Sequence, residues 1–306
     1  MTKKLLFVAV LLLALSVCAH AWIGVYGCRA DGDFSGTNPP VAAPGFVVAP
    51  AANAVGASGA GSSAPGATNA YGMYISSNVP VVGIRSGTYV VSLPTAGYYN
   101  VANTFGNVNQ AVARPDAKWV ITSASGSTTV YQDQTPAASK NKWLDLGTYK
   151  FNANDSTNTK VMLTNDNQSV GGSLYLHSVK FETVTPGAVG YGIADGASLD
   201  VGDLIDLGLS WTAGQYAMAY DLWFGEDANN MTKLIGNYNG LGFGLDPDSL
   251  AAGKTYFWRV DSINVDKVGT GELMSFSTNA IPEPGSMLAL ATGFVGLFGM
   301  IRRKRS

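Results

Sequence analysis

The sequence predicts an all-β protein built from two antiparallel β-sandwich domains and followed by a single C-terminal transmembrane helix. Three observations favour this class. Short runs of Tyr, Thr, Ser, Asn and Val recur along the 306 residues and alternate polar with apolar side chains, as half-buried strands do. Long amphipathic helical patterns are missing between residues 22 and 284. Continuous apolar segments lie near the two ends, at residues 5–17 and 285–301.

Charge is distributed unevenly along the chain. Six of the 19 basic residues lie in segments 1–21 and 285–306, which contain no acid. The part between them therefore carries 13 basic against 21 acidic residues. A nucleic-acid-binding protein needs a basic face to replace phosphate counterions, so we expect no nucleic-acid partner.

The first 21 residues have the three parts of a secretory signal peptide. Lys3 and Lys4 supply the positive start, an apolar run follows, and Ala19-His20-Ala21 is a small-x-small cleavage site. We expect signal peptidase to leave a mature chain that starts at Trp22. An uncleaved anchor is the alternative, although the apolar run is short for a spanning helix.

Residues 22–70 form a tract rich in Gly, Ala, Ser and Pro. Such a stretch buries too little apolar surface to offset its ordering entropy. We expect a flexible lead or a long surface insertion. Cys28 lies in this tract and has no second cysteine to pair with after signal removal, so a free or buried thiol is favoured over an intermolecular bridge.

Residues 71–184 are predicted to form the first sandwich. Runs of period-two alternation mark its strands, and turn residues such as Ala124-Ser125-Gly126 and Gly171-Gly172 separate them. Short strands at this spacing are typical of an antiparallel sandwich or jelly roll. The expected strands include Tyr99–Val101, Trp119–Ile121, Val161–Leu163, Leu174–Leu176 and Val179–Phe181.

Several segments of this domain resemble the carbohydrate-binding-like domain of golvesins and xanthan lyases. The most specific is Trp143–Phe151, and the others are Gly97–Val101, Val130–Gln134 and Leu176–Phe181. The closing strand of that family usually carries Ala-Asp-Ala-Val, where this chain has Leu-His-Ser-Val from residue 176, so any role of that aspartate is lost or altered here. The resemblance implies a jelly-roll-like fold and suggests a saccharide ligand.

A saccharide site combines an exposed aromatic face, which packs against the C–H side of a sugar ring, with polar groups for the hydroxyls. Tyr98, Trp119, Tyr131 and Trp143 are the aromatic candidates. Aromatic side chains bury about 150–250 Å² each and commonly serve a core. We therefore expect Trp119 and Trp143 in the core and retain Tyr98 and Tyr131 as candidate glycan contacts, with a core position for Tyr98 left open.

Residues 185–200 are expected to form a Gly-rich linker, and residues 201–279 a second sandwich. Strand patterns in the second domain resemble those of fibronectin type III domains, in which a tyrosine caps a corner with its hydroxyl. The resemblance implies that role for Tyr256, core positions for Trp211 and Trp258, and a spacing or display function. The expected strands are Leu207–Trp211, Ala219–Gly225, the end of Leu250–Val260, and Met274–Thr278.

Residues 280–306 combine three features in a fixed order. Pro282-Glu283-Pro284 comes first, an apolar run of 17 residues follows, and Arg302-Arg303-Lys304-Arg305 comes after it. At about 1.5 Å per residue the run spans about 26 Å, just short of a hydrocarbon core of about 30 Å. Four consecutive cations resist crossing a membrane and are expected to stay in the cytoplasm.

This tail resembles the PEP-CTERM sorting signal of Gram-negative bacteria. The resemblance implies a membrane-embedded exosortase that recognises Pro-Glu-Pro and processes the tail, often alongside exopolysaccharide production. We expect a transient inner-membrane intermediate and then the cell surface or extracellular matrix. A simple tail anchor is the alternative.

No catalytic group is expected. After signal removal His177 is the one histidine, and it lies in a predicted strand without a nucleophile motif, so a hydrogen-bonded sheet histidine is favoured. Asp31 with Asp33, and Asp246 with Asp248, carry oxygens of the kind that calcium binds, but neither pair has a full binding loop. We therefore expect no metal and no cofactor, with calcium unsupported.

The sequence thus predicts an exported, non-catalytic protein that binds or organises polysaccharide through residues 71–184. A structural or adhesive surface protein without a specific glycan ligand is the alternative. A secreted lyase or glycosidase is a third interpretation, because glycosidase chemistry needs only two carboxylates.

Overall fold

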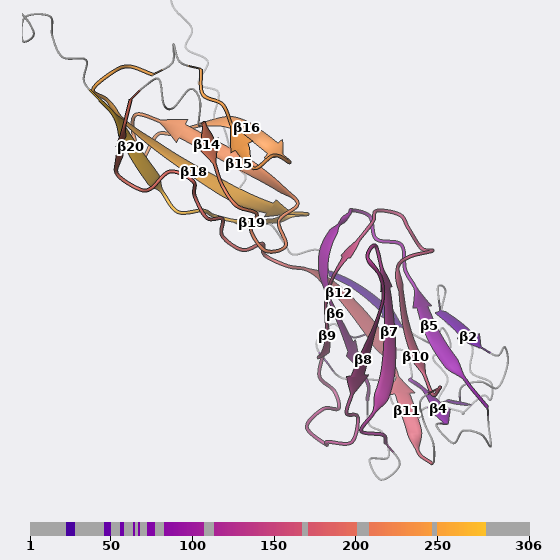
Figure 1. Cartoon of the computed structure of the whole chain (residues 1–306). Helices are drawn as coiled ribbons and strands as arrows, with labels where there is room; N and C mark the ends of the chain where they lie inside the picture. Colours follow the sequence, from indigo (N-terminus) through magenta and orange to yellow (C-terminus); the bar gives the residue numbers. More distant parts are fainter. Residues whose placement is uncertain are drawn as a thin grey trace, which may run out of the picture. The chain divides into compact units, whose positions relative to one another are not determined.

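A computed structural model of the chain describes residues 23–27, 46–49, 56–57, 64, 67, 72–76, 83–106, 113–166, 171–200, 208–246 and 250–279. Every regular element in these ranges is a β-strand, so the predicted all-β class is confirmed. The chain divides into two compact units, residues 1–184 and 185–306 (Figure 1). Among the described residues, no helix is long and apolar enough to cross a membrane. The two predicted terminal segments, with their cleavage and sorting residues, lie outside these ranges.

The first unit contains three antiparallel sheets. A four-stranded sheet has the order β1-β12-β6-β9, a five-stranded sheet has the order β2-β5-β10-β7-β8, and a small sheet has the order β11-β4-β3. Figure 1 shows β8, β7, β10 and β5 next to one another, in the order of the five-stranded sheet. The strands are β1 Ile23–Gly27, β2 Phe46–Ala49, β3 Gly56–Ala57, β4 Met73–Ser76, β5 Ser86–Val90, β6 Gly97–Thr104, β7 Ala117–Ser123, β8 Gly126–Gln132, β9 Leu144–Phe151, β10 Lys160–Thr164, β11 Ser173–Leu176 and β12 Ser178–Thr183.

Period-two patterning sets which side chains enter the core of this unit. Strand β7 alternates buried and half-buried residues along its whole length, as a strand with one covered face does. Each of the five predicted strands lies inside one of these elements. The buried side chains of the two larger sheets include Tyr89, Trp119, Ile121, Val161 and Leu163 from one and Tyr99, Val101, Phe151, Val179 and Phe181 from the other.

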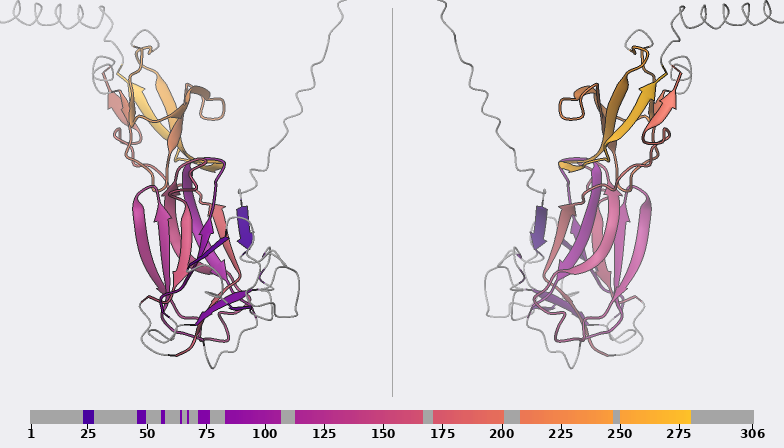
Figure 2. Two further views of the ribbon diagram at one scale, coloured as in Figure 1. Left: turned by 90° about the vertical axis from the view of Figure 1, so that its right-hand side faces the viewer. Right: turned by 90° about the vertical axis from the view of Figure 1, so that its left-hand side faces the viewer.

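Parts of the tract before residue 71, expected to be a flexible lead or a long surface insertion, pair with strands of these sheets. β1 pairs with β12 from Ile23 opposite Glu182, and β2 pairs with β5 from Phe46 opposite Tyr89 (Figure 2). β3 pairs with β4 in the small sheet. The sequences Ile-Gly-Val-Tyr-Gly and Phe-Val-Val-Ala are β-favouring islands in a Gly/Ala-rich surrounding, and each completes the border of a sheet.

The segment from Trp143 to Phe151 contains a β-bulge that explains the glycine at position 147. The β6–β9 register shifts where Val101 faces Gly147. Gly147 has φ +111°, and a Cβ there would lie 2.9 Å from the Tyr149 hydroxyl, so glycine is required. That hydroxyl donates a hydrogen bond of 2.6 Å to the Leu146 carbonyl, and burial raises the pKa of Tyr149.

The second unit is built around one sheet of six strands. Its main path is β13-β20-β18-β15-β16, β19 pairs with β18, and β14 pairs with β17 in a separate two-stranded sheet. Trp211 and Trp258 are both buried in its core. The backbone N–H of Ala251 donates a 2.8 Å hydrogen bond to the hydroxyl of buried Tyr256, so this tyrosine caps the corner before β18. The strands are β13 Ala197–Leu199, β14 Leu209–Ser210, β15 Ala219–Gly225, β16 Thr232–Tyr238, β17 Gly242–Phe243, β18 Thr255–Asn264, β19 Lys267–Gly269 and β20 Met274–Thr278.

Residues 185–200, expected as a linker, take part in this second unit. Val189 and Ile193 are buried in its core. The ring of Tyr191 lies edge-on to that of Trp258, with the two ring centroids 4.9 Å apart. The backbone of residues 187–192 hydrogen-bonds to residues 210–215. The apolar residues alternate with glycines here, and a Cβ at Gly190 would lie 2.9 Å from Thr212 Oγ1. The glycines therefore allow the segment to pack closely against its neighbours. Amino-acid composition alone indicated a flexible linker instead.

Candidate functional site

The outward-facing side chains of four strands form a regular polar surface, which we call the outer face. It comprises Ser86, Thr88 and Val90 on β5, Lys160 and Met162 on β10, Lys118, Val120 and Thr122 on β7, and Ser127, Thr129 and Tyr131 on β8. Directly paired residues of antiparallel strands point to the same side of a sheet, so the register places these side chains together. On β5, β7 and β10 the alternate residues, such as Tyr89 and Trp119, are buried on the opposite side.

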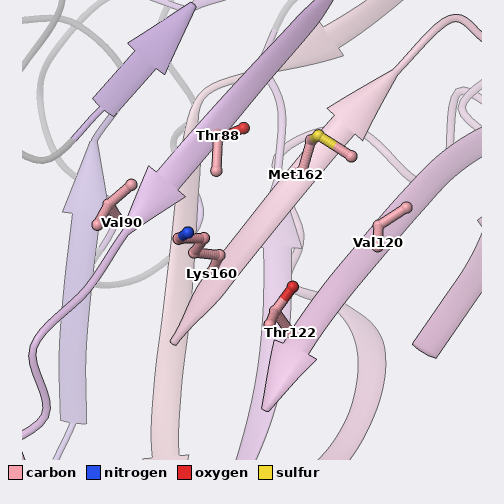
Figure 3. Close-up of a pocket in the computed structure, with 6 residues that line it drawn as sticks. All are labelled: Thr88, Val90, Val120, Thr122, Lys160 and Met162. Atoms are coloured by element: carbon pink, nitrogen blue, oxygen red, sulfur yellow. The ribbon is translucent and has the colours of Figure 1, made fainter. Parts of the chain in front are cut away.

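A shallow groove of about 380 Å³ lies on the outer face (Figure 3). Its lining residues come in pairs from three neighbouring strands, and the register puts Lys160 between Val90 and Thr122. Two hydroxyls, one ammonium group and three apolar side chains therefore share a single concave surface. The lining residues are Thr88, Val90, Val120, Thr122, Lys160 and Met162.

Tyr131, one of the two predicted glycan contacts, lies on the same outer face. Its side chain is 58% exposed, and it pairs with Lys118 across β7 and β8. Lys118 Nζ forms an ion pair of 2.9 Å with Asp166. By strand geometry, Tyr131 lies about 13 Å along the strands and about 10 Å across them from Lys160. An extended chain of several sugars would be needed to contact both.

Tyr98, the other predicted contact, lies on a different sheet. It is half-buried on β6, and the ammonium of Lys150 on β9 lies 5.9 Å from its ring centroid. Its outward neighbour Asn100 donates a 2.7 Å hydrogen bond to Asp145. The structure therefore does not bring Tyr98 and Tyr131 into one site.

The two tryptophan candidates separate in the structure. Trp119 is 1% exposed and lies in the core, where it was expected. Trp143 was also expected in the core, but it is half-buried, and the ammonium of Lys180 lies 5.3 Å from its ring centroid. The difference arises because Trp143 precedes β9 by one residue, so the alternation of that strand does not direct it inward.

His177 lies between β11 and β12 rather than inside a strand, but it is buried and hydrogen-bonded, as expected for a structural role. Its Nδ1 lies 2.8 Å from the hydroxyl of Ser178, and both residues are at most 1% exposed. A substrate would need direct access to such a pair for general-base chemistry. At this burial the pair is shielded from solvent and from any dissolved substrate.

Within the described ranges, no group of three or more His, Cys, Asp or Glu residues is placed to hold a metal ion. Of the calcium candidates, Asp246 lies beside an apolar groove of the second unit. Asp31, Asp33, Asp248 and the thiol of Cys28 lie outside the described residues.

The groove itself was not anticipated from the sequence. The sequence pattern that belongs to the groove consists of three pairs of residues, each with a buried residue between its members. The pairs are Thr88-x-Val90, Val120-x-Thr122 and Lys160-x-Met162. Such pairs identify outward positions of single strands. They do not show which strands are neighbours, and the groove exists because β10 lies between β5 and β7.

Comparison with known families identifies two parts of the chain. Residues 46–183 match the Golvesin C-terminal domain, and residues 280–305 match the PEP-CTERM protein-sorting motif. The first match begins at β2, inside the tract that was expected to be a lead or an insertion. A search of curated proteins found no match.

Two solved structures show weak similarity. A Paenibacillus xanthan lyase is 23% identical with a TM-score of 0.31, and the alignment covers 47% of this chain and 14% of the lyase. The tripod of the bacteriophage Tuc2009 baseplate is 13% identical with a TM-score of 0.19, over 86% of this chain and 99% of that one. The family matches carry the assignment: the first unit contains a golvesin-type domain, and the PEP-CTERM motif implies export, a membrane-anchored sorting intermediate and processing by an exosortase.

Proposed function

We propose that this chain is a cell-envelope or extracellular-matrix protein of a Gram-negative bacterium that binds or organises polysaccharide, without catalysis, through the outer face of its first unit. The observation that carries the proposal is the groove of about 380 Å³ on the same face as the exposed ring of Tyr131, within the golvesin-type domain. The sorting motif supports the location, because it implies delivery to the envelope.

The chemistry of the outer face suits a sugar polymer. The exposed ring of Tyr131 offers a flat surface to the C–H side of a sugar, and the hydroxyls of Thr88 and Thr122 offer donors and acceptors to its hydroxyl groups. The side chains stand on paired strands, so the surface is formed before a ligand arrives and loses little entropy on binding.

The architecture we propose is jelly-roll-like for the first unit and fibronectin type III-like for the second. The two larger sheets with buried alternate residues support the first assignment. The cap made by Tyr256 and the buried Trp211 and Trp258 support the second. The second unit lies between the golvesin-type domain and the sorting motif along the chain, so its proposed role is that of a spacer.

Glycoside hydrolysis at the groove is disfavoured by its composition. A glycosidase needs a pair of carboxylates across the scissile bond. None of the six residues that line the groove is acidic. A structural or adhesive protein without a specific glycan remains the alternative function.

The test is polysaccharide binding by the full chain, purified in mild detergent, with affinity electrophoresis against a panel of neutral and acidic polymers. We expect at least one polymer to bind, and Tyr131→Ala to weaken that binding by roughly tenfold, equivalent to about 1.4 kcal/mol. Tyr98→Ala is the matched control, because that ring lies on the other large sheet. Binding to no polymer would favour the structural alternative, and a loss with Tyr98→Ala alone would move the site to the four-stranded sheet.

A further inference from the structure

We propose that the groove selects polysaccharides that carry carboxylate groups, as uronic acids do, and that Lys160 is the residue that binds the carboxylate. The inference rests on the proposed function and names the ligand class of the same site. It follows from the charge of the groove rather than from its shape.

Lys160 has no ionic partner within the part of the chain that the structure describes. Two other strand lysines of this unit form ion pairs: Lys118 pairs with Asp166, and Lys180 pairs with Glu182 at 2.8 Å. Lys150 lies over the ring of Tyr98. Lys160 is half-buried in the groove, between Val90 and Thr122.

The acidic residue closest to Lys160 in sequence is held by its own turn. Asp155 lies in the turn before β10, where its carboxylate accepts hydrogen bonds from the Asn158 backbone at 3.1 Å and the Asn158 side chain at 2.9 Å. These hydrogen bonds hold the pKa of Asp155 below its usual value. Because the groove lining also contains no acid, the charge of Lys160 is left to attract an anion from outside.

The neighbours of Lys160 strengthen this attraction and shape it for a sugar. Val90, Val120 and Met162 form apolar walls, which lower the local dielectric and make a charge-assisted hydrogen bond stronger than it would be in water. Thr122 adds a hydroxyl, which lies 3.1 Å from the hydroxyl of Ser127 on β8. A uronate ring matches this combination, since it joins one carboxylate to hydroxyls and a C–H face.

The presence of a single cation in the groove also favours a carboxylate over other anionic groups. Phosphate and sulfate groups are bound best by arginine forks or by several donors. Attraction to an anionic membrane needs a cluster of about four to eight basic residues. The groove contributes one lysine, which suits one carboxylate per repeating unit of a polymer.

The experiment compares one polymer in two chemical forms. Polyglucuronate and the same polymer after reduction of its carboxyl groups are titrated against the full chain in mild detergent. We expect the native form to bind about tenfold more tightly, as the loss of one charge-assisted hydrogen bond implies. Lys160→Gln should remove that preference and leave binding of the reduced polymer unchanged. Lys160→Arg should retain most of the preference.

Lys150→Gln is the matched control, since it removes one positive charge from the four-stranded sheet of the same unit. Equal losses in Lys150→Gln and Lys160→Gln would mean that net charge acts at long range, and would overturn the inference. Equal affinity for the native and reduced polymers would overturn it while leaving the proposed function in place. Failure of the wild-type protein to bind any polymer would contradict both the proposed function and this inference. Binding to anionic vesicles in place of polymers, lost in Lys160→Gln, would assign the groove to a different anion.

Discussion

At the scale of single residues, one buried glutamine side chain holds a loop of the first unit against a strand. Gln134 follows β8 and is completely buried. Its Nε2 donates a 2.9 Å hydrogen bond to the carbonyl of Tyr175, and its Oε1 accepts a 2.8 Å hydrogen bond from the N–H of the same residue. The side chain thus takes the place of a neighbouring strand and ties the loop after β8 to β11.

Replacement of this amide should destabilise the first unit. Gln134→Leu keeps the approximate volume but leaves the N–H and C=O of Tyr175 buried without partners, at a cost of about 3 kcal/mol. The measurement is urea unfolding of the first unit, followed by tryptophan fluorescence. Thr128→Val on β8 is the control, because Thr128 is exposed and its change should stay within about 0.5 kcal/mol. Equal stability of Gln134→Leu and wild-type protein would show that the amide bonds are dispensable.

Which aromatic residues are exposed was predictable only in part from the sequence. Trp119 was expected in the core and is buried there, and Tyr131, retained as a candidate glycan contact, is exposed. Trp143 was placed wrongly because it stands just before its strand. The partners that decide the site are long-range, since Lys160 meets Val90 and Thr122 from strands far away in the chain. A single sequence carries no direct record of such pairings.

At the scale of elements, two strands of the second unit were predicted closely. β15 and β20 have the bounds that the sequence indicated, Ala219–Gly225 and Met274–Thr278. Among the elements that the sequence did not indicate, β1, β2 and β13 are short and lie in segments that contain several glycines and alanines. Each is held by a partner that is distant in sequence, as with Ala197 of β13 opposite Phe276 of β20. Their strand character depends on tertiary pairing more than on local propensity.

The segment 185–200 offers a test of this element-level difference. Ile193 is 7% exposed and packs in the core of the second unit. Ile193→Ala should lower the free energy of unfolding of that unit by about 2–3 kcal/mol, through lost burial and the cavity left behind. Ala188→Ser changes an exposed residue of the same segment and should have little effect. Differential scanning calorimetry measures both, and an unchanged transition in Ile193→Ala would restore the interpretation of the segment as a linker.

At the scale of the whole molecule, the charge distribution matches the sorting route. The part between the terminal segments has 13 basic and 21 acidic residues, whereas the last six residues contain four cations and no acid. Placing a cation at the centre of a membrane costs about 2.5–3.5 kcal/mol on the insertion scale, so a block of four is a strong stop to translocation. The apolar run before it is at the short limit for spanning, about 26 Å by helical rise. The cations should therefore decide whether the intermediate stays anchored.

Neutralising this block should release the intermediate from the membrane. In a host strain without exosortase, we expect the wild-type chain to fractionate with the inner membrane. A variant with Arg302→Gln, Arg303→Gln, Lys304→Gln and Arg305→Gln should appear in the soluble periplasmic fraction, because nothing then opposes passage of the short apolar run. The variant Arg302→Lys, Arg303→Lys and Arg305→Lys keeps the charge and should remain in the membrane, which separates charge from sequence recognition. Cell fractionation and immunoblotting distinguish these outcomes, and full membrane retention of the glutamine variant would show that the apolar run anchors the chain without the cations.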